Sequence, residues 1–186
     1  MNELKNLLLK FYQLTKKLKI DYVIVGAFSL FAWGRIRATR DIDIILERKN
    51  MKKKMEKFLE EAEKLNLVID KDDFKKSFEK GGHFSIFNKN SIFYLDCKFA
   101  FTNLDEETLK DKVVLKIFEK RIKFSSPEIL IISKLIFGSS KDLEDVRSIL
   151  IRSWKKIDFK KLEKFAKKYK IKRKLEKILK SFKNEN

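Results

Sequence analysis

Residues 23–46 read VIVGAFSLFAWGRIRATRDIDIIL and place two acids, Asp41 and Asp43, inside a segment with the composition of a buried strand. Side chains alternate along a strand, so the acids share one face with Ile45, and the other face takes Ile42, Ile44 and Leu46. The two carboxylates lie about 7 Å apart by strand rise and repel each other. An isolated pair of this kind is typical of an exposed edge or a helix cap. The surrounding isoleucines instead predict a central strand, where divalent cations would offset the repulsion.

A third acid, Asp96, is the one acid in the apolar strand IFYLDCKFA at 92–100. Three carboxylates holding two Mg²⁺ (or Mn²⁺) ions about 4 Å apart form a site for phosphoryl-type transfer. Gly26 ends the strand at 21–25 and opens a helix at 27–33, which lets phosphate approach backbone N–H groups. An ordinary strand-to-helix turn would use the same glycine. No GxGxxG, Walker lysine or nucleophile elbow is present, so His83 is expected to pack or to face solvent.

The rest of the chain reads as regular structure with few breaks. We expect an amphipathic helix at 2–19, a charged helix at 50–65, hairpin strands at 83–87 and 91–100 around Asn88, Lys89 and Asn90, and two strands within 113–124. From 125 the pattern is helical: Ser125 or Ser126 caps, Glu128 completes a capping box with Ser125, a helix restarts at Ser139 or Ser140, and basic helices follow near 158–168 and 171–182. The sequence predicts an α+β fold with a central mixed β-sheet flanked by helices at 1–124, and an α-helical part at 125–186.

Charge is distributed unevenly over the 186 residues, whose formal net charge is +18. Residues 152–186 alone hold 15 Lys/Arg and 4 Asp/Glu. A basic tail favours a polyanionic partner such as RNA, although a lysine-rich solvated surface would give the same composition. One cysteine excludes an internal disulfide, and one histidine excludes a Cys/His zinc site. Without a long apolar run or a signal peptide, we expect a soluble cytoplasmic protein with no membrane contact.

The quoted run, together with Asp96, resembles the DNA polymerase β-like nucleotidyltransferase superfamily. It is most similar to the AbiEii/AbiGii-type toxins and related uncharacterised nucleotidyltransferases, which show G-x-x-R-x-T-x-D-I-D. The matching positions are Gly34, Arg37, Thr39, Asp41, Ile42 and Asp43. Residues 128–150 resemble the later K-L…K-D-x-x-D motif of that family at Lys134, Leu135, Lys141, Asp142 and Asp145. The glycine pair or Gly-Ser of the family is Gly26-Ala27 here, which removes a hydroxyl; Ser29 follows two residues on.

The resemblance implies a role for each matching residue. Asp41 and Asp43 would hold both metals, and Asp96 would complete the metal site and orient or deprotonate the acceptor hydroxyl. The nucleotide would contact Gly26, Ala27, Ser29, Arg37, Thr39, Lys134, Lys141, Asp142 and Asp145, with Lys134 also stabilising charge on pyrophosphate. Alternatively, Asp142 complements a helix dipole and Asp145 is a solvated partner of Lys141.

The implied activity is Mg²⁺-dependent transfer of a nucleoside monophosphate from an NTP to an acceptor hydroxyl, with release of pyrophosphate. The toxin branch and the basic helices favour RNA as acceptor, at a tRNA 3′ end, and imply an antitoxin partner. The same chemistry on a small-molecule or protein hydroxyl is an alternative. So are a nucleotide-sugar glycosyltransferase with a D-x-D site, and a catalytically inactive RNA-binding relative.

Overall fold

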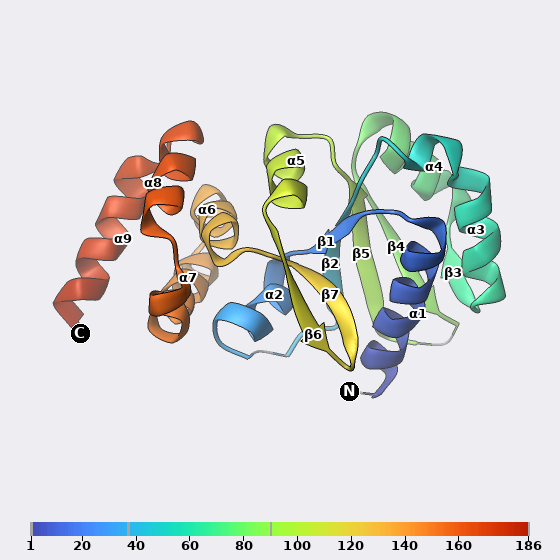
Figure 1. Ribbon diagram of the computed structural model, residues 1–186, viewed down its shortest axis with the longest axis horizontal. Coiled ribbons are helices and arrows are strands. Elements are labelled where there is room, and N and C mark those ends of the chain that lie inside the picture. Colours follow the sequence, from blue (N-terminus) through green and yellow to red (C-terminus); the bar gives the residue numbers. More distant parts are fainter. Residues whose placement is uncertain (1, 37, 90, 186) are drawn as a thin grey trace. The chain divides into compact units, whose positions relative to one another are not determined.

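The computed structural model describes residues 2–36, 38–89 and 91–185 (Figure 1). The chain divides into two compact units. One unit contains residues 1–28 and 38–124, and the other contains residues 29–37 and 125–186. Arg37 and Asn90, both named above, lie outside the described residues.

Within the described ranges, the first unit is built on a seven-stranded sheet in the order β3-β4-β5-β2-β1-β7-β6 (Figure 1). The strands are β1 Tyr22–Ile24, β2 Asp41–Leu46, β3 Leu67–Ile69, β4 His83–Asn88, β5 Tyr94–Phe99, β6 Lys112–Ile117 and β7 Lys120–Ser125. Strand β2 runs parallel to β5, and β1 runs parallel to β7. The pairs β1–β2, β3–β4 and β4–β5 are antiparallel. The predicted α+β fold with a mixed sheet is confirmed.

Alternation along the central strands separates an apolar face from a polar one, as the DIDIIL pattern predicts. On β2 the residues Ile42, Ile44 and Leu46 are buried, whereas Asp41 and Asp43 are half-buried. The neighbouring strands extend the apolar face with Leu95, Cys97, Phe99, Phe84 and Ile86. The two acids of β2 therefore lie on the face opposite the main core.

Three helices cover the apolar face: α1 Asn2–Leu18, α3 Met55–Lys64 and α4 Lys71–Lys80, with the short helix η1 Met51–Lys53 before α3. Phe74 of α4 joins them to the sheet, because its ring packs edge-on against both Phe84 and Phe99. The helix α5 Asn103–Lys110 packs on the other face, where Leu109 contacts a buried cluster containing Val23 and Ile45. It covers the end of β2 beyond the acids, so the polar face begins at Asp43.

The elements β3, α4 and α5 of the first unit lie in segments for which we made no prediction. The two helices carry local start signals. The side chain of Asp70 accepts hydrogen bonds from the N–H groups of Asp72 and Asp73, both at 2.9 Å. Thr102 and Asp105 form a capping box at the start of α5. Both patterns are recognised N-terminal signatures of helices.

The second unit is helical within the described residues and contains α6 Pro127–Phe137, α7 Ser140–Ser153, η2 Trp154–Lys156, α8 Phe159–Lys168 and α9 Lys172–Glu185. The helix α2 Gly26–Trp33 starts in the first unit and ends in this one. The indole N–H of Trp33 donates to the carbonyl of Ser125 at 2.8 Å, and the hydroxyl of Ser153 in α7 donates to the carbonyl of Trp33 at 2.7 Å, which attaches this segment to the helical unit.

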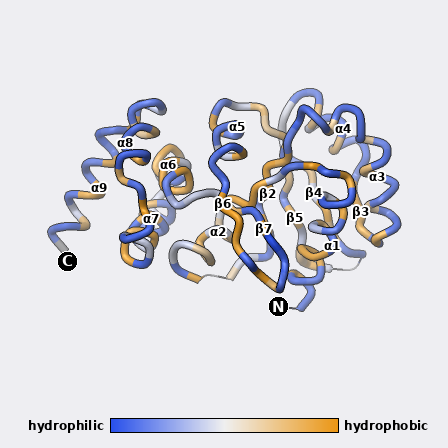
Figure 2. Tube along the Cα trace, in the orientation of Figure 1, coloured by the Kyte–Doolittle hydropathy of each residue, from blue (hydrophilic) through white to orange (hydrophobic). Residues whose placement is uncertain are grey.

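The predicted capping box at α6 is wrong in its partners. Ser126, and not Ser125, caps the helix by accepting from the N–H of Ile129. Glu128 is buried and accepts from the N–H of Asp158 at 2.8 Å, so it anchors the start of α8. Helix α8 is mostly hydrophilic (Figure 2), with a buried face formed by Leu162, Phe165 and Ala166. Among the described residues, no helix has the length and apolar character needed to cross a membrane.

Candidate active site

The polar face of the sheet brings the three predicted carboxylates together. In the parallel pairing of β2 with β5, Asp43 is the register partner of Asp96, and Asp41 is the partner of Tyr94. Register partners on neighbouring strands point to the same face, and neighbouring strands lie about 5 Å apart. The two predicted strands are therefore neighbours, and their acids project side by side.

Each carboxylate has its own hydrogen-bond partner. The hydroxyl of Thr39 donates to the carboxylate of Asp41, and the phenol of Tyr94 donates to the same group at 3.4 Å. Oδ2 of Asp43 accepts from the backbone N–H of Ala27 at 3.3 Å. Nδ1 of His83 lies 2.7 Å from Oδ1 of Asp96.

The electrostatic effect of the acids is visible at two neighbouring side chains. The pKa of the Tyr94 phenol is raised above its ordinary value, first by the charge of Asp41, then by burial and by the charges of Asp96 and Asp43. Burial raises the pKa of the Cys97 thiol well above its usual range, and Asp96 and Asp43 add to the effect. Three negative charges therefore act on one small region of the sheet, as a cation site requires.

Gly26 makes room for one of these carboxylates. Its φ of +61° lies in the left-handed region, where glycine has no steric penalty. A β-carbon added at this position would lie 1.8 Å from Oδ2 of Asp43. The turn between β1 and α2 therefore needs glycine for two reasons: the backbone is left-handed there, and a β-carbon would overlap the carboxylate of Asp43.

The donor set fits a hard divalent cation, because carboxylate oxygens are the ligands that Mg²⁺ and Mn²⁺ prefer. Within residues 2–36, 38–89 and 91–185, however, no three His, Cys, Asp or Glu side chains already converge as a metal cage. Asp41 instead contacts the hydroxyl of Thr39, Asp43 the N–H of Ala27, and Asp96 the imidazole of His83.

The predicted charged residues of α6 and α7 form a network within the second unit. Nζ of Lys134 lies 2.9 Å from a carboxylate oxygen of Asp142 and 2.9 Å from one of Asp145. Asp145 is fully buried and also binds Arg35, at 3.0 Å. It is therefore a buried ion-pair partner of Lys134 and not a solvated partner of Lys141, which is exposed.

Asp142 also caps its own helix, through a capping box with Ser139. Burial raises the pKa of Asp142, but hydrogen bonds from Ser139 and Lys134 outweigh burial and hold that pKa below its ordinary value. The alternative of a first-turn acid that stabilises the helix N-terminus fits this contact. Ser29, predicted to face a triphosphate, is buried in the second unit, with its hydroxyl 3.3 Å from that of Ser125.

Two residues of the carboxylate cluster were not predicted as site residues. Tyr94 is two positions before Asp96, so strand alternation places both on one face, and this signal was available in the sequence. His83 was expected to pack or to face solvent; its side chain is 58% exposed, but it also contacts Asp96. The predicted hairpin at 83–87 and 91–100 brings the two strands together, but the contact depends on their register, which the sequence pattern did not fix.

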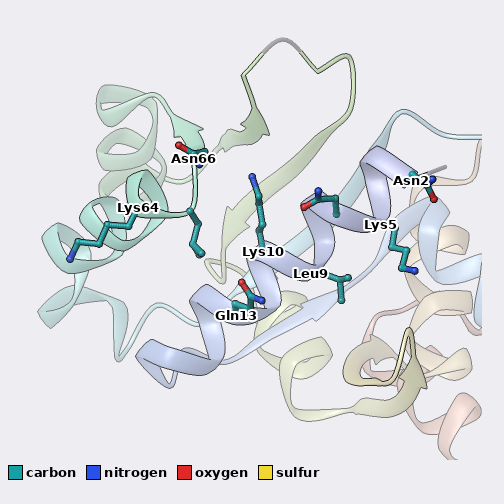
Figure 3. Close-up of a pocket in the computed structure, with 9 residues that line it drawn as sticks. Asn2, Lys5, Leu9, Lys10, Gln13, Lys64 and Asn66 are labelled. Carbon is teal, nitrogen blue, oxygen red and sulfur yellow. The ribbon is translucent and has the colours of Figure 1, made fainter.

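A different hollow, of about 630 Å³, lies along α1 in the first unit (Figure 3). Its lining comes from α1 and from the end of α3 with the following turn: Asn2, Lys5, Asn6, Leu9, Lys10, Gln13, Lys64, Leu65 and Asn66. No carboxylate is among these residues, so the hollow lacks the acids that a divalent-metal site needs.

Comparison with solved structures places the fold among nucleotidyltransferases. The crystal structure of ANT(2")-Ia in complex with adenylyl-2"-tobramycin is similar to this chain with a TM-score of 0.58 and 15% identity, covering 88% of this chain and 95% of that one. A nucleotidyltransferase-like antigenic protein from Paracoccidioides brasiliensis is similar with a TM-score of 0.52 and 18% identity, covering 81% and 76%. No curated protein matches the sequence.

The family is shown by the sequence itself. The family model for "Nucleotidyltransferase of unknown function (DUF6036)" matches residues 2–185, and the chain belongs to this family. The predicted nucleotidyltransferase resemblance is confirmed at this level. The closer likeness to AbiEii-type toxins stays a prediction.

Proposed function

We propose that this protein transfers a nucleoside monophosphate from an NTP to an acceptor hydroxyl and releases pyrophosphate. The observation that carries the proposal is the register of β2 with β5, which sets Asp43 beside Asp96 and Asp41 beside Tyr94 on the polar face. Membership of a nucleotidyltransferase family supports the same reaction class.

The proposed cofactor is a pair of Mg²⁺ or Mn²⁺ ions, which Asp41, Asp43 and Asp96 would hold. When bound, such ions stabilise charge on the attacking and leaving oxygens of a phosphoryl-type transfer. The carboxylate donors and the charge that they impose on Tyr94 fit this role.

The remaining residues of the site hold or orient these groups. Thr39 restrains Asp41 by donating to its carboxylate, and His83 restrains Asp96 in the same way. The backbone N–H of Ala27, at the start of α2, points at the carboxylate of Asp43. We propose that the triphosphate approaches this helix start, where N–H groups and the helix dipole favour negative charge. Asp96 then takes the proton of the acceptor hydroxyl as that oxygen attacks the α-phosphorus and the bond to pyrophosphate breaks.

Lys134 and Asp145 are best explained as stabilising the helical unit. Lys134 already has two carboxylate partners, and releasing it toward a phosphate would leave the buried Asp145 short of one of its cations. Lys141 is exposed and remains a predicted phosphate contact.

We propose RNA as the acceptor, through the hydroxyl of its 3′ end. The net charge of +18 and the Lys-rich helices α8 and α9 support a polyanionic partner, because phosphate contacts from lysines bind RNA irrespective of sequence. A toxin role and an antitoxin partner rest on the sequence resemblance alone.

The direct test is incubation of the protein with each of four α-labelled NTPs and with tRNA or total RNA, with and without Mg²⁺. Metal-dependent label on RNA, absent in the Asp43→Asn variant, is the expected result. Label that persists in that variant would contradict the assignment of the carboxylates.

A second candidate keeps the chemistry and changes the acceptor to a small-molecule hydroxyl. The similar fold of ANT(2")-Ia, which was solved with adenylyl-2"-tobramycin, favours this alternative. Adding tobramycin or a mixture of hydroxylated metabolites in place of RNA distinguishes the two. Transfer to the small molecule alone would replace the RNA proposal.

A further inference from the structure

A small hollow on the first unit has the features of a binding subsite. Its volume is about 280 Å³, and it is lined by Ser85, Phe87, Ser91 and Tyr94. Ser85 and Phe87 come from β4, Tyr94 starts β5, and Ser91 lies in the connection between these strands.

Strand register places this hollow beside the carboxylates. Phe87 pairs with Tyr94 across β4 and β5, and Tyr94 pairs in turn with Asp41 across β5 and β2. Two residues further along each strand, and therefore on the same face, Ser85 pairs with Asp96. A molecule in the hollow therefore adjoins the acid that we assign to the acceptor hydroxyl.

The two aromatic rings lie outside the aromatic core. Both Phe87 and Tyr94 are half-buried, and neither stacks on another ring within the described part of the chain. The aromatic side chains under the opposite face, Phe58, Phe74, Phe84 and Phe99, pack against one another instead. A half-exposed pair of rings on neighbouring strands can stack a planar group.

We propose that this hollow is the acceptor subsite and that it holds the 3′-terminal nucleoside of a single-stranded RNA. The base stacks on Phe87 and Tyr94, and the ribose hydroxyl points toward Asp96. This inference rests on the proposed transfer reaction: the proton of that hydroxyl passes to Asp96, its oxygen bonds to the α-phosphorus, and pyrophosphate leaves.

Size and charge favour a nucleoside over a polycationic amino sugar. A volume of about 280 Å³ lies just below the ~300–1,000 Å³ range for drug-sized ligands, so it suits one nucleoside with the rest of the RNA outside. All four lining side chains are neutral, whereas an amino sugar requires acids for its ammonium groups. The acids nearby are those that we assign to the metal.

The test measures binding without NTP or metal, using a 5′-fluorescein-labelled single-stranded RNA trinucleotide and anisotropy at raised salt. Raised salt suppresses backbone contacts and leaves stacking as the main contribution. We expect Phe87→Ala to weaken binding about tenfold, within the range for loss of one stacked base. Phe118→Ala is the matched control, because Phe118 is 41% exposed in the same unit and distant in sequence from the hollow. Phe87→Leu, which keeps apolar bulk without a ring, should weaken binding as Phe87→Ala does, and Phe87→Trp should restore it.

Equal affinities for the native protein and the folded Phe87→Leu variant would overturn the subsite. Tobramycin is the competitor in the same assay. If it displaces the trinucleotide, binds more tightly than the trinucleotide and loses affinity in the Phe87 variants, the assignment of RNA is overturned. A transfer assay separates this inference from the proposed function. A tenfold higher KM for RNA in Phe87→Leu, with kcat and the KM for NTP unchanged, supports both. Phe87-dependent RNA binding without any transfer would support the subsite and contradict the reaction.

Discussion

Gly26 and Asp43 lie so close that the first residue has no room for a β-carbon: such an atom would be 1.8 Å from Oδ2 of Asp43. The contact joins the start of α2 to the central strand β2. It also explains why the turn needs glycine for more than its φ of +61°.

The variant Gly26→Ala should therefore lose both stability and activity. The left-handed backbone alone costs a non-glycine residue roughly 1–2 kcal/mol, and the carboxylate of Asp43 must also move. Gly138→Ala is the matched control, since its φ is +70° but the nearest atom to a β-carbon would be 3.5 Å away. Chemical denaturation and the transfer assay, run on both variants, should show a loss of stability for both, larger for Gly26→Ala, and loss of activity for Gly26→Ala only. Full activity in Gly26→Ala would contradict the role of this contact.

Asp43→Asn should abolish transfer without unfolding the protein. Loss of a metal-binding charge removes several kcal/mol of transition-state stabilisation, or about a hundredfold to a thousandfold in rate. In the absence of metal, the free energy of unfolding should stay the same or rise, because repulsion from Asp96 is relieved. Asp72→Asn, on the exposed start of α4, is the control for loss of an acid. A less stable Asp43→Asn protein would indicate a structural acid.

The alternation in DIDIIL was enough to predict which side of β2 is polar, because a period of two is a local property of the chain. Asp96 was predicted as a partner because it interrupts an apolar strand. Strand order is different, since it depends on contacts between distant segments. The predicted hairpin joined 83–87 to 91–100 but did not fix their register, and without the register neither the contact of His83 with Asp96 nor the hollow at Phe87 could be derived.

In the second unit, the burial of a side chain likewise depends on contacts between distant segments, so the roles of its charged residues could not be predicted. The spacing of Lys134 and Asp145 is compatible with a ligand site and with a structural ion pair, and the sequence does not distinguish them. The complete burial of Asp145 favours the ion pair. By contrast, helices α4 and α5 were missed although Asp70 and the Thr102–Asp105 pair were readable start signals.

Lys134→Met should destabilise the protein by about 3 kcal/mol, the cost of removing one partner from a buried ion pair. Asp145 retains Arg35 but loses a contact of 2.9 Å. Lys141→Met, at an exposed position of the same unit, should change stability by less than about 0.5 kcal/mol. Urea titrations of both variants measure this difference. If Lys134→Met is as stable as the native protein but inactive, Lys134 is a ligand contact after all.

The lysines of α8 should set the salt dependence of RNA binding. Lys160, Lys164 and Lys167 are exposed and recur at helical spacing, so their replacement by glutamine removes three charges and spares the buried face. If all three contact phosphates, the negative slope of log affinity against log salt should become shallower by about 2 for single-stranded RNA. Replacing Lys75, Lys76 and Lys80 of α4 removes the same charge from exposed positions of the other unit. Equal slopes for the two triple variants would assign the effect to net charge alone.

Acid should remove a stabilising contribution from Asp105, a buried acid that caps α5 and lies 2.7 Å from Nζ of Lys98. Burial raises the pKa of Asp105, but bonds from Lys98 and Thr102 outweigh it and hold that pKa below its ordinary value of 3.8. The unfolded chain therefore binds the proton more readily, and the contribution is complete above pH 3.8 and lost as the pH falls through the lower folded-state pKa. At pH 7, Asp105→Asn should cost about 2 kcal/mol, typical of a hydrogen bond to a charged group. Denaturant titrations from pH 7 down to pH 3 should show the difference between variant and native protein shrinking only at the acid end. If the difference in unfolding free energy between the variant and the native protein were independent of pH, the charge of Asp105 would contribute nothing to stability.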